Sequence, residues 1–195
     1  MTALARDRFA VVSSDSDELI LVNQHDEEIG SADKLLCHDG KGMLHRAFSV
    51  LLFNQHGELL LQKRAAEKRL WGDFWSNSCC SHPRVGESMH EAARRRVAEE
   101  LGLEIADLVY LYKFEYHAQF GELGAEHELC SVFIGRCDSE AEPNANEISA
   151  VRWLSAAALE AELNADEAAF TPWFKMEWAH INKHFKAELE ALYNS

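Results

Sequence analysis

Residues 77–103 constrain the fold and the chemistry of this chain more than any other segment. They begin with NSCCSHP, in which Cys80 and His82 stand two residues apart, and continue into a predicted helix over residues 88–101. Ser88 is a suitable N-cap, a glutamate three residues later completes a capping box, apolar residues recur every four positions, and a glycine follows the last of them. A thiol and an imidazole therefore stand just before an acid-rich helix, which places a candidate proton donor beside a candidate metal and diphosphate site.

The other elements predict a layered fold. Arg46–Phe53 and Glu58–Lys63 are apolar runs joined by an Asn-Gln-His-Gly turn, which predicts a β-hairpin. A first strand is predicted over Glu18–Asn23, with Gly30 in the turn after it. Further strands are predicted over 108–119, 128–136 and 151–154, and helices over 156–164 and 171–192. Strands in a mixed sheet with helices on its faces predict an α+β fold, built as an α-β-α layered domain.

We expect one domain, because 195 residues can bury a full-sized core and the chain has only three prolines and no Gly/Ser-rich linker. Residues 18–195 are predicted to form this domain. Residues 1–17 are polar and are expected to form a loosely held arm.

Charge and cysteine content argue against several classes of partner. A net charge of −14 repels nucleic acid and anionic lipid. No apolar run approaches the ~20 residues that span a bilayer, and the first residues lack the apolar segment of a secretory signal. Five cysteines form neither a paired framework nor a Cys-x-x-Cys motif, so we expect reduced thiols and a cytoplasmic protein. We expect a monomer or a weak homodimer.

The predicted helix after His82 carries a charge pattern with two interpretations. Four of its flanking and internal charges follow the order E-x7-R-x3-E-E: Glu87, Arg95, Glu99 and Glu100. Pairs four residues apart fit a solvated helix with salt bridges. The pattern also resembles the Nudix box, in which a loop and a helix present carboxylates to divalent metals bound to a diphosphate. Ser81 replaces the first glycine of that box and Arg96 replaces a glutamate, which weighs against pyrophosphate hydrolysis but leaves diphosphate binding through Glu100 and Mg²⁺.

Three separate segments supply a candidate metal site: His38, His45, His82, Glu126 and Glu128. The two glutamates stand two residues apart on a predicted strand, so they share one face while His127 points to the other. Three nitrogens and two oxygens suit Mn²⁺ or Mg²⁺, with Zn²⁺ as an alternative. The spacing also fits scattered polar residues in a chain with ten histidines.

The order of these motifs resembles type 1 isopentenyl diphosphate isomerase, a family of the Nudix superfamily. The residues that carry the resemblance are Lys34, His38, HRAFS at 45–49, WSNSCCSHP at 75–83, EHE at 126–128 with Cys130, and FTPW at 170–173. The resemblance runs from about Leu19 to Trp178. It implies a Nudix-type fold, one metal ion held by the three histidines and two glutamates, and an enzyme of isoprenoid biosynthesis that interconverts isopentenyl and dimethylallyl diphosphate.

The resemblance also implies roles for the reacting groups. The family's catalytic cysteine falls on Cys80 and its catalytic glutamate on Glu128, with Tyr116 hydrogen bonded to that glutamate. The reaction passes through a tertiary carbocation and needs two proton-transfer groups, here a strand carboxylate that donates and a loop thiol that accepts, or the reverse in the other direction. A free thiol titrates near ~8.5, so nearby cations would have to lower the pKa of Cys80. Cys79 faces the other way and is expected to pack in the core.

Four cationic residues match family positions near the diphosphate: Lys34, Arg64, Lys68 and Arg96. Trp173 matches an aromatic residue that covers the carbocation, and aromatic faces stabilise a desolvated cation by ~2 kcal/mol or more. Individually, these cations also fit surface charges and the tryptophan fits core packing. Two alternatives to the isomerase are a Nudix hydrolase of a nucleoside diphosphate derivative and an inactive Nudix module that binds a ligand or partner.

Overall fold

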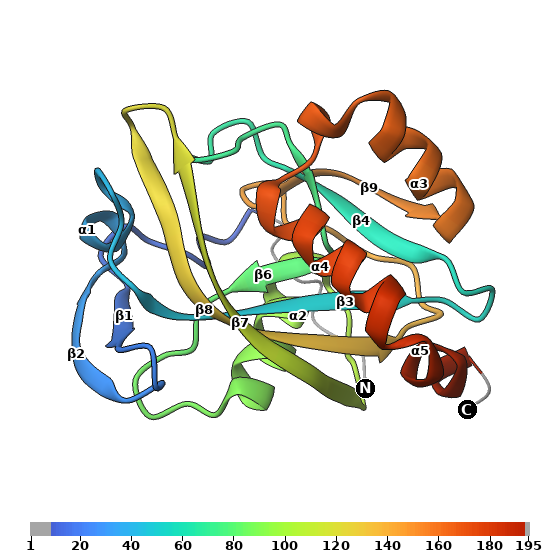
Figure 1. The fold of residues 1–195 in the computed structure, drawn as a ribbon, viewed down its shortest axis with the longest axis horizontal. Coiled ribbons are helices and arrows are strands. Elements are labelled where there is room, and N and C mark those ends of the chain that lie inside the picture. Colours follow the sequence, from blue (N-terminus) through green and yellow to red (C-terminus); the bar gives the residue numbers. More distant parts are fainter. Residues whose placement is uncertain (1–8, 194–195) are drawn as a thin grey trace.

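Nine strands of the described residues form one mixed β-sheet that lies between helices (Figure 1). The structure is a computed structural model that describes residues 9–193. The strands are β1 (Glu18–Val22), β2 (Glu28–Asp33), β3 (His45–Phe53), β4 (Leu59–Arg64), β5 (Trp75–Ser76), β6 (Cys79–Ser81), β7 (Leu108–Phe120), β8 (Gly124–Arg136) and β9 (Ile148–Leu154). The helices are α1 (Lys34–His38), α2 (Met89–Leu101), α3 (Ala156–Ala165), the 3-10 turn η1 (Glu167–Ala169), α4 (Pro172–His184) and α5 (Lys186–Tyr193). None of the helices within these residues has the length and apolar character that a membrane crossing requires.

Strand β3 lies at the centre of the sheet. It pairs in parallel with β8 along its whole length, from His45 opposite Glu128 to Phe53 opposite Arg136. Along its other edge it pairs with the short strand β6, antiparallel. Eight of the nine residues of β3 are buried, as expected for a strand covered on both faces. This register places the first residue of β3 beside the carboxylates of β8.

Helices cover both faces of the sheet, which confirms the predicted α-β-α layering (Figure 1). On one face, Val97 and Leu101 of α2 pack in one cluster with Phe48 and Val50 of β3. On the other face, residues of α3, α4 and α5 pack with the alternate residues of β3. The period-2 alternation of side chains in β3 therefore supplies both cores.

The local signals that predict α2 are confirmed. Ser88 Oγ accepts a hydrogen bond from the Glu91 backbone N–H (3.3 Å), and Glu91 Oε2 accepts one from the Ser88 backbone N–H (3.1 Å). Gly102 ends the helix with a left-handed φ of 70°. These caps satisfy backbone groups that a helix leaves unpaired at its ends, so the start and end of α2 follow from nearby residues alone.

Two predicted details are wrong, and the predicted hairpin is shorter than expected. The Asn54–Gly57 turn joins β3 and β4 as an antiparallel pair, but the two strands pair only at Phe53 and Leu59, and β4 continues along β9 and β5. Gly30 lies inside β2 opposite Leu21, and not in a turn. The long helix over 171–192 is two helices, because Phe185 leaves helical geometry and stacks on Tyr112 of β7. The extent of the hairpin and the end of the first of these helices depend on partners that are distant in sequence, which the local pattern does not reveal.

The described part of the predicted arm, residues 9–17, is hydrogen bonded to the domain. Asn146 and Asn144 donate through their side-chain amides to the carbonyls of Phe9 (2.6 Å) and Ala10 (2.9 Å). Arg96 Nη1 donates to the carbonyl of Val12 (2.5 Å). This segment therefore runs beside a buried arginine of α2, while residues 1–8 lie outside the described part of the chain.

Candidate active site

The five predicted metal ligands lie together at one end of the central strands. One ligand atom from each residue falls within 4.8 Å of the others: His38, His45, His82, Glu126 and Glu128. His38 ends α1, His45 begins β3, His82 follows β6, and both glutamates lie on β8. The parallel register of β3 and β8 and the alternation of side chains along β8 bring them to one side, while His127 points away and contacts Glu115 at 3.2 Å.

Two of the imidazoles are fixed in one orientation by backbone carbonyls. Nδ1 of His38 donates to the carbonyl of Lys34 (2.7 Å), and Nδ1 of His45 donates to the carbonyl of Met43 (2.7 Å). The Nε2 atom of each ring is then the unprotonated nitrogen of the neutral tautomer, and this atom faces the cluster. Such outer hydrogen bonds orient metal-binding histidines in proteins.

The contacts inside the cluster fit ligands around a shared cation. Glu126 Oε2, a buried carboxylate oxygen, lies 2.8 Å from His38 Nε2. The Nε2 atoms of His45 and His82 are 3.1 Å apart. Burial and the neighbouring His45 lower the pKa of His82 well below its ordinary value, so this ring is neutral, which is the form that binds a metal. Three imidazoles beside two buried carboxylates are a set of donors that suits a divalent ion.

Cys80 lies beside this cluster on the short strand β6, and not on a loop as predicted. It pairs with Ser49 of β3, and it packs against the core on the α4 side of the sheet, whereas Cys79 packs with α2 on the opposite face. Burial raises the pKa of the Cys80 thiol to about 12, against the opposing effect of Arg64, whose Nη1 lies 3.7 Å from Sγ. The thiol therefore keeps its proton in the substrate-free site.

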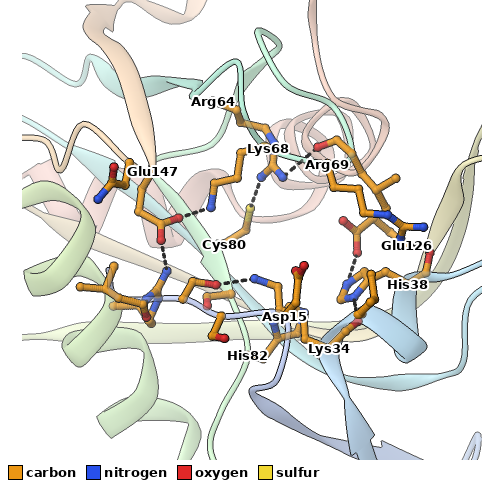
Figure 2. A pocket seen from close by; sticks show the side chains of 18 of the residues that line it. Asp15, Lys34, His38, Arg64, Lys68, Arg69, Cys80, His82, Glu126 and Glu147 are labelled. Carbon is orange, nitrogen blue, oxygen red and sulfur yellow. Dashed lines mark hydrogen bonds and ion pairs between the residues drawn. The ribbon is translucent and has the colours of Figure 1, made fainter. Parts of the chain in front are cut away.

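Glu128 is held by a phenol as the resemblance implies. Tyr116 Oη donates to Glu128 Oε2 (2.7 Å), and His82 Nε2 lies 3.2 Å from the other oxygen. Burial alone would raise the pKa of Glu128, but His45 and Tyr116 bring it below its ordinary value. Cys80, Tyr116 and Glu128 line one cavity of about 290 Å³. Figure 2 shows Cys80 in this cavity with Arg64 beside it.

Trp173 forms part of the same cavity. Its Nε1 donates to Ser76 Oγ (3.1 Å) and Asn77 Oδ1 (3.2 Å), and the guanidinium of Arg64 lies over its ring at 5.3 Å. The ring is only 2% exposed and packs edge-on against Trp71. Hydrogen bonds and packing thus fix an aromatic face on the cavity wall, near the thiol.

The four predicted diphosphate ligands, which are Lys34, Arg64, Lys68 and Arg96, all line this cavity. Figure 2 labels the first three of them. Four other charged residues on the wall were missed by the sequence analysis: Asp15, Glu67, Arg69 and Glu147. Arg69 and Glu147 are buried more deeply than the exposed Asp15 and Glu67. Glu147 pairs with Lys68, and Arg69 pairs with Asp39 (2.6 Å). No motif signals either residue, because both reach the cavity from loops whose course depends on the rest of the fold.

The predicted magnesium ligand Glu100 is placed differently. Its Oε1 accepts hydrogen bonds from Arg96 Nη2 (2.6 Å) and Nε (3.1 Å), and it is not among the residues that line the cavity. Arg95 pairs with Glu87 (2.7 Å) and Glu99 (3.1 Å), so the ion pairs expected on α2 are present. Glu100 is therefore paired with Arg96 in this structure and does not face the cavity.

Comparisons with known proteins agree with this geometry. Residues 43–174 match the NUDIX domain family model. Isopentenyl-diphosphate Delta-isomerase 2 of Photorhabdus laumondii is 47% identical over 80% of this chain and 88% of its own length. Isopentenyl-diphosphate Delta-isomerase 1 of the same organism is 40% identical over 87% of this chain and 97% of its own length. The chain belongs to the type 1 isopentenyl-diphosphate isomerase family of the Nudix superfamily.

Solved structures confirm the Nudix-type fold of this isomerase-family chain. DR0079 from Deinococcus radiodurans covers 82% of the chain and 96% of its own length, with a TM-score of 0.65 and 28% identity. The MutT protein from Methanosarcina mazei covers 73% of the chain and 96% of its own length, with a TM-score of 0.59 and 21% identity, and shows the fold alone. The α-β-α layering predicted from the sequence is therefore the layering of this superfamily.

A buried carboxyl one turn beyond Trp173 leads to a prediction for stability. Glu177 is fully buried, its Oε2 has no hydrogen-bond partner among the described residues, and burial raises its pKa from 4.5 to about 8. Between these values the unfolded chain loses a proton that the folded protein keeps, so stability falls as pH rises. We expect Glu177→Gln to raise the free energy of unfolding by on the order of 3–5 kcal/mol at pH 8 and to change it little at pH 4.

Urea unfolding at both pH values checks this expectation. The exposed Glu188 of α5 offers a control, because Glu188→Gln should leave the free energy of unfolding nearly unchanged at either pH. A gain for Glu177→Gln that is the same at pH 4 and pH 8 would contradict the assigned pKa direction.

Proposed function

We propose that this chain performs the isomerisation of its family, the interconversion of isopentenyl and dimethylallyl diphosphate, with Cys80 and Glu128 as the proton-transfer groups. One observation supports this assignment above the others. A single cavity is lined by a protonated thiol, by a carboxylate held by Tyr116, and by the aromatic face of Trp173. An unactivated double bond needs such a pair of groups and an apolar, aromatic wall for the cation between the two transfers.

The protonation states suggest how the pair works. Cys80 carries a proton in the substrate-free site, and the pKa of Glu128 lies below its ordinary value. These states fit a cycle in which the thiol protonates the terminal carbon of the double bond and the carboxylate removes a proton from the carbon on the other side of the cationic centre. In the opposite direction Glu128 donates and Cys80 accepts, which is the assignment made from the sequence. Tyr116 keeps its own proton, because burial and Glu128 raise its pKa well above the ordinary value, so it remains a hydrogen-bond donor to the carboxylate.

The metal cluster is proposed to hold one ion on His38, His45, His82, Glu126 and Glu128. Mn²⁺ suits this set of nitrogens and oxygens, with Mg²⁺ or Zn²⁺ as alternatives. A bound ion would neutralise the two buried carboxylates and hold Glu128 in place on the cavity wall. Independently of the ion, Tyr116 and the β3–β8 register direct the Glu128 carboxylate into the cavity.

The diphosphate is proposed to bind at the cationic part of the cavity. Lys34, Arg64 and Lys68 line it, and Arg96 lies 4% exposed on the same wall. In a chain with a net charge of −14, such a cluster favours a small anion over a polyanion. Mg²⁺ is proposed to accompany the diphosphate on Glu100, after Arg96 turns from that carboxylate to the phosphate oxygens.

Assays with two substrate classes test the proposal. Isopentenyl diphosphate, with Mn²⁺ and Mg²⁺ present, should be converted to dimethylallyl diphosphate, and nucleoside diphosphate derivatives should release neither phosphate nor nucleoside monophosphate. Hydrolysis without isomerisation would favour the Nudix hydrolase. Isomerase turnover near the wild-type level in either the Cys80→Ala or the Glu128→Gln variant would contradict the assigned roles.

We also propose that the protein is cytoplasmic and that it is a monomer or a weak homodimer. Light scattering at several protein concentrations tests the oligomeric state.

A further inference from the structure

Among the described residues, Glu147 is the one carboxylate that contacts two of the proposed diphosphate ligands, Lys68 and Arg96. It precedes β9, is 3% exposed, and lines the cavity (Figure 2). Its backbone is fixed on both sides, since its N–H donates to the Asn144 carbonyl (3.0 Å) and its carbonyl accepts from the Ala65 N–H (3.0 Å). Its carboxylate forms an ion pair with Lys68 and lies 3.5 Å from Arg96 Nη2.

Three cations act on the carboxylate of Glu147: Lys68, Arg96 and Lys34. Burial lowers the pKa of Lys34, and the nearby charges of Lys68 and Arg96 lower it further. Burial alone would raise the pKa of Glu147, but Lys68 and Arg96 bring it below its ordinary value, so it is ionised. Glu147 is thus the carboxylate that pairs with Lys68, whereas Arg96 also pairs with Glu99 and Glu100.

Two of these cations are also satisfied by oxygens of the N-terminal segment. Lys34 Nζ donates to Ser13 Oγ, and Arg96 Nη1 donates to the Val12 carbonyl (2.5 Å). Both oxygens are uncharged, and both belong to residues that line the same cavity. Protein oxygens therefore contact Lys34, Lys68 and Arg96. Among the oxygens that contact the two lysines, only the carboxylate of Glu147 carries a full negative charge.

We propose that Glu147 is a positioning residue for diphosphate binding: it acts through Lys68 and Arg96 as their counter-ion in the substrate-free protein, and it competes with the diphosphate for them. This inference rests on the proposed function, because it assumes that this end of the cavity receives the diphosphate. Glu147 keeps the cations together when the cavity is empty. Its charge also weakens diphosphate affinity, which favours release of a product that carries the same diphosphate group as the substrate.

The proposal predicts a sign that a purely structural ion pair does not. Removing a negative charge beside a bound anion strengthens anion binding, because repulsion between them is lost and the cations are released to the ligand. If Glu147 only held Lys68 in place, its removal would instead weaken binding. Both roles predict that the substrate-free protein loses stability when Glu147 is replaced, so the melting temperature does not distinguish them. The change in affinity for an anion does.

Calorimetric titration with inorganic pyrophosphate tests this prediction on the full chain. We expect Glu147→Gln to bind pyrophosphate about tenfold more tightly than the wild type, with a lower KM for isopentenyl diphosphate and a kcat that does not rise. Glu67→Gln is the matched control, because Glu67 is an exposed carboxylate on the same cavity wall, and its removal should change the affinity much less.

A second variant keeps the test decisive if Glu147→Gln does not fold. Glu147→Asp retains the charge but withdraws it from Lys68 by one methylene, so it should tighten pyrophosphate binding by a smaller factor. Equal or weaker binding in the folded variants would overturn the role of Glu147. Absence of pyrophosphate binding by the wild type would instead overturn the diphosphate site itself, which distinguishes the two proposals.

Discussion

Replacing Cys80 with alanine is expected to reduce isomerase turnover by roughly 10²- to 10⁴-fold, the usual contribution of a positioned acid or base. The thiol lies on the cavity wall beside Arg64 and is protonated in the substrate-free site. Alanine leaves the strand pairing of β6 with β3 intact, because that pairing uses backbone groups only. The fold and the nearby metal cluster should therefore be retained while one of the two proton transfers loses its partner.

Steady-state conversion of isopentenyl diphosphate, measured beside circular dichroism and metal content, checks this prediction. Cys79→Ala is the matched control, since it removes a thiol from the next residue on the α2 side of the sheet. The control should lose stability by on the order of 1 kcal/mol from the small cavity that it leaves, and keep its turnover. Near wild-type turnover in Cys80→Ala would refute the role of this thiol.

Replacing His45 with alanine is expected to abolish ion binding at the five-residue cluster and isomerase activity with it. His45 is fully buried, and its Nε2 faces the Nε2 of His82 at 3.1 Å. Its loss removes one of three nitrogens, and loss of only an outer partner already costs 10–100-fold in metal affinity in known sites. Glu126 and Glu128 would then remain as two buried carboxylates with less compensating positive charge, which misplaces the second proton-transfer group.

Elemental analysis of the purified protein and a titration with Mn²⁺ measure this effect. The wild type should hold one ion per chain at the cluster, and His45→Ala should hold none there. His127→Ala is the matched control, because His127 lies between the two glutamates in sequence but contacts Glu115 on the opposite side of β8. An equal loss of metal in both variants, or full activity of His45→Ala without a bound ion, would contradict the proposed site.

The sequence predicted the elements whose causes are local. Helix α2 has its N-cap, its apolar stripe and its terminal glycine within sixteen consecutive positions, Ser88 to Leu103, and the structure places its ends where these signals lie. The same is true of the Glu126–Glu128 alternation, which depends only on the period of a strand. Elements that depend on distant partners were missed, such as the pairing of β4 with β9 and the break between α4 and α5 at Phe185.

The residues of the candidate site also fall into two groups, those that a sequence motif identifies and those that only the folded structure identifies. Its histidines, glutamates and Cys80 were identifiable because the chemistry requires those residue types and the family places them in recognisable motifs. Glu147 was not, because a single glutamate after a loop asparagine has no pattern of its own. Only the packing of residues 143–147 beside Lys68 and Arg96 turns it into a buried counter-ion.

The order and type of its residues alone determined the family of this chain, its layered architecture and the atoms available for metal binding and proton transfer. Tertiary structure decided which of those atoms meet, how deeply each is removed from water, and therefore which of them are charged. Residue identity sets what a group can do, whereas pKa values and ion pairs depend on distance and burial, and these arise only when segments far apart in the chain pack together.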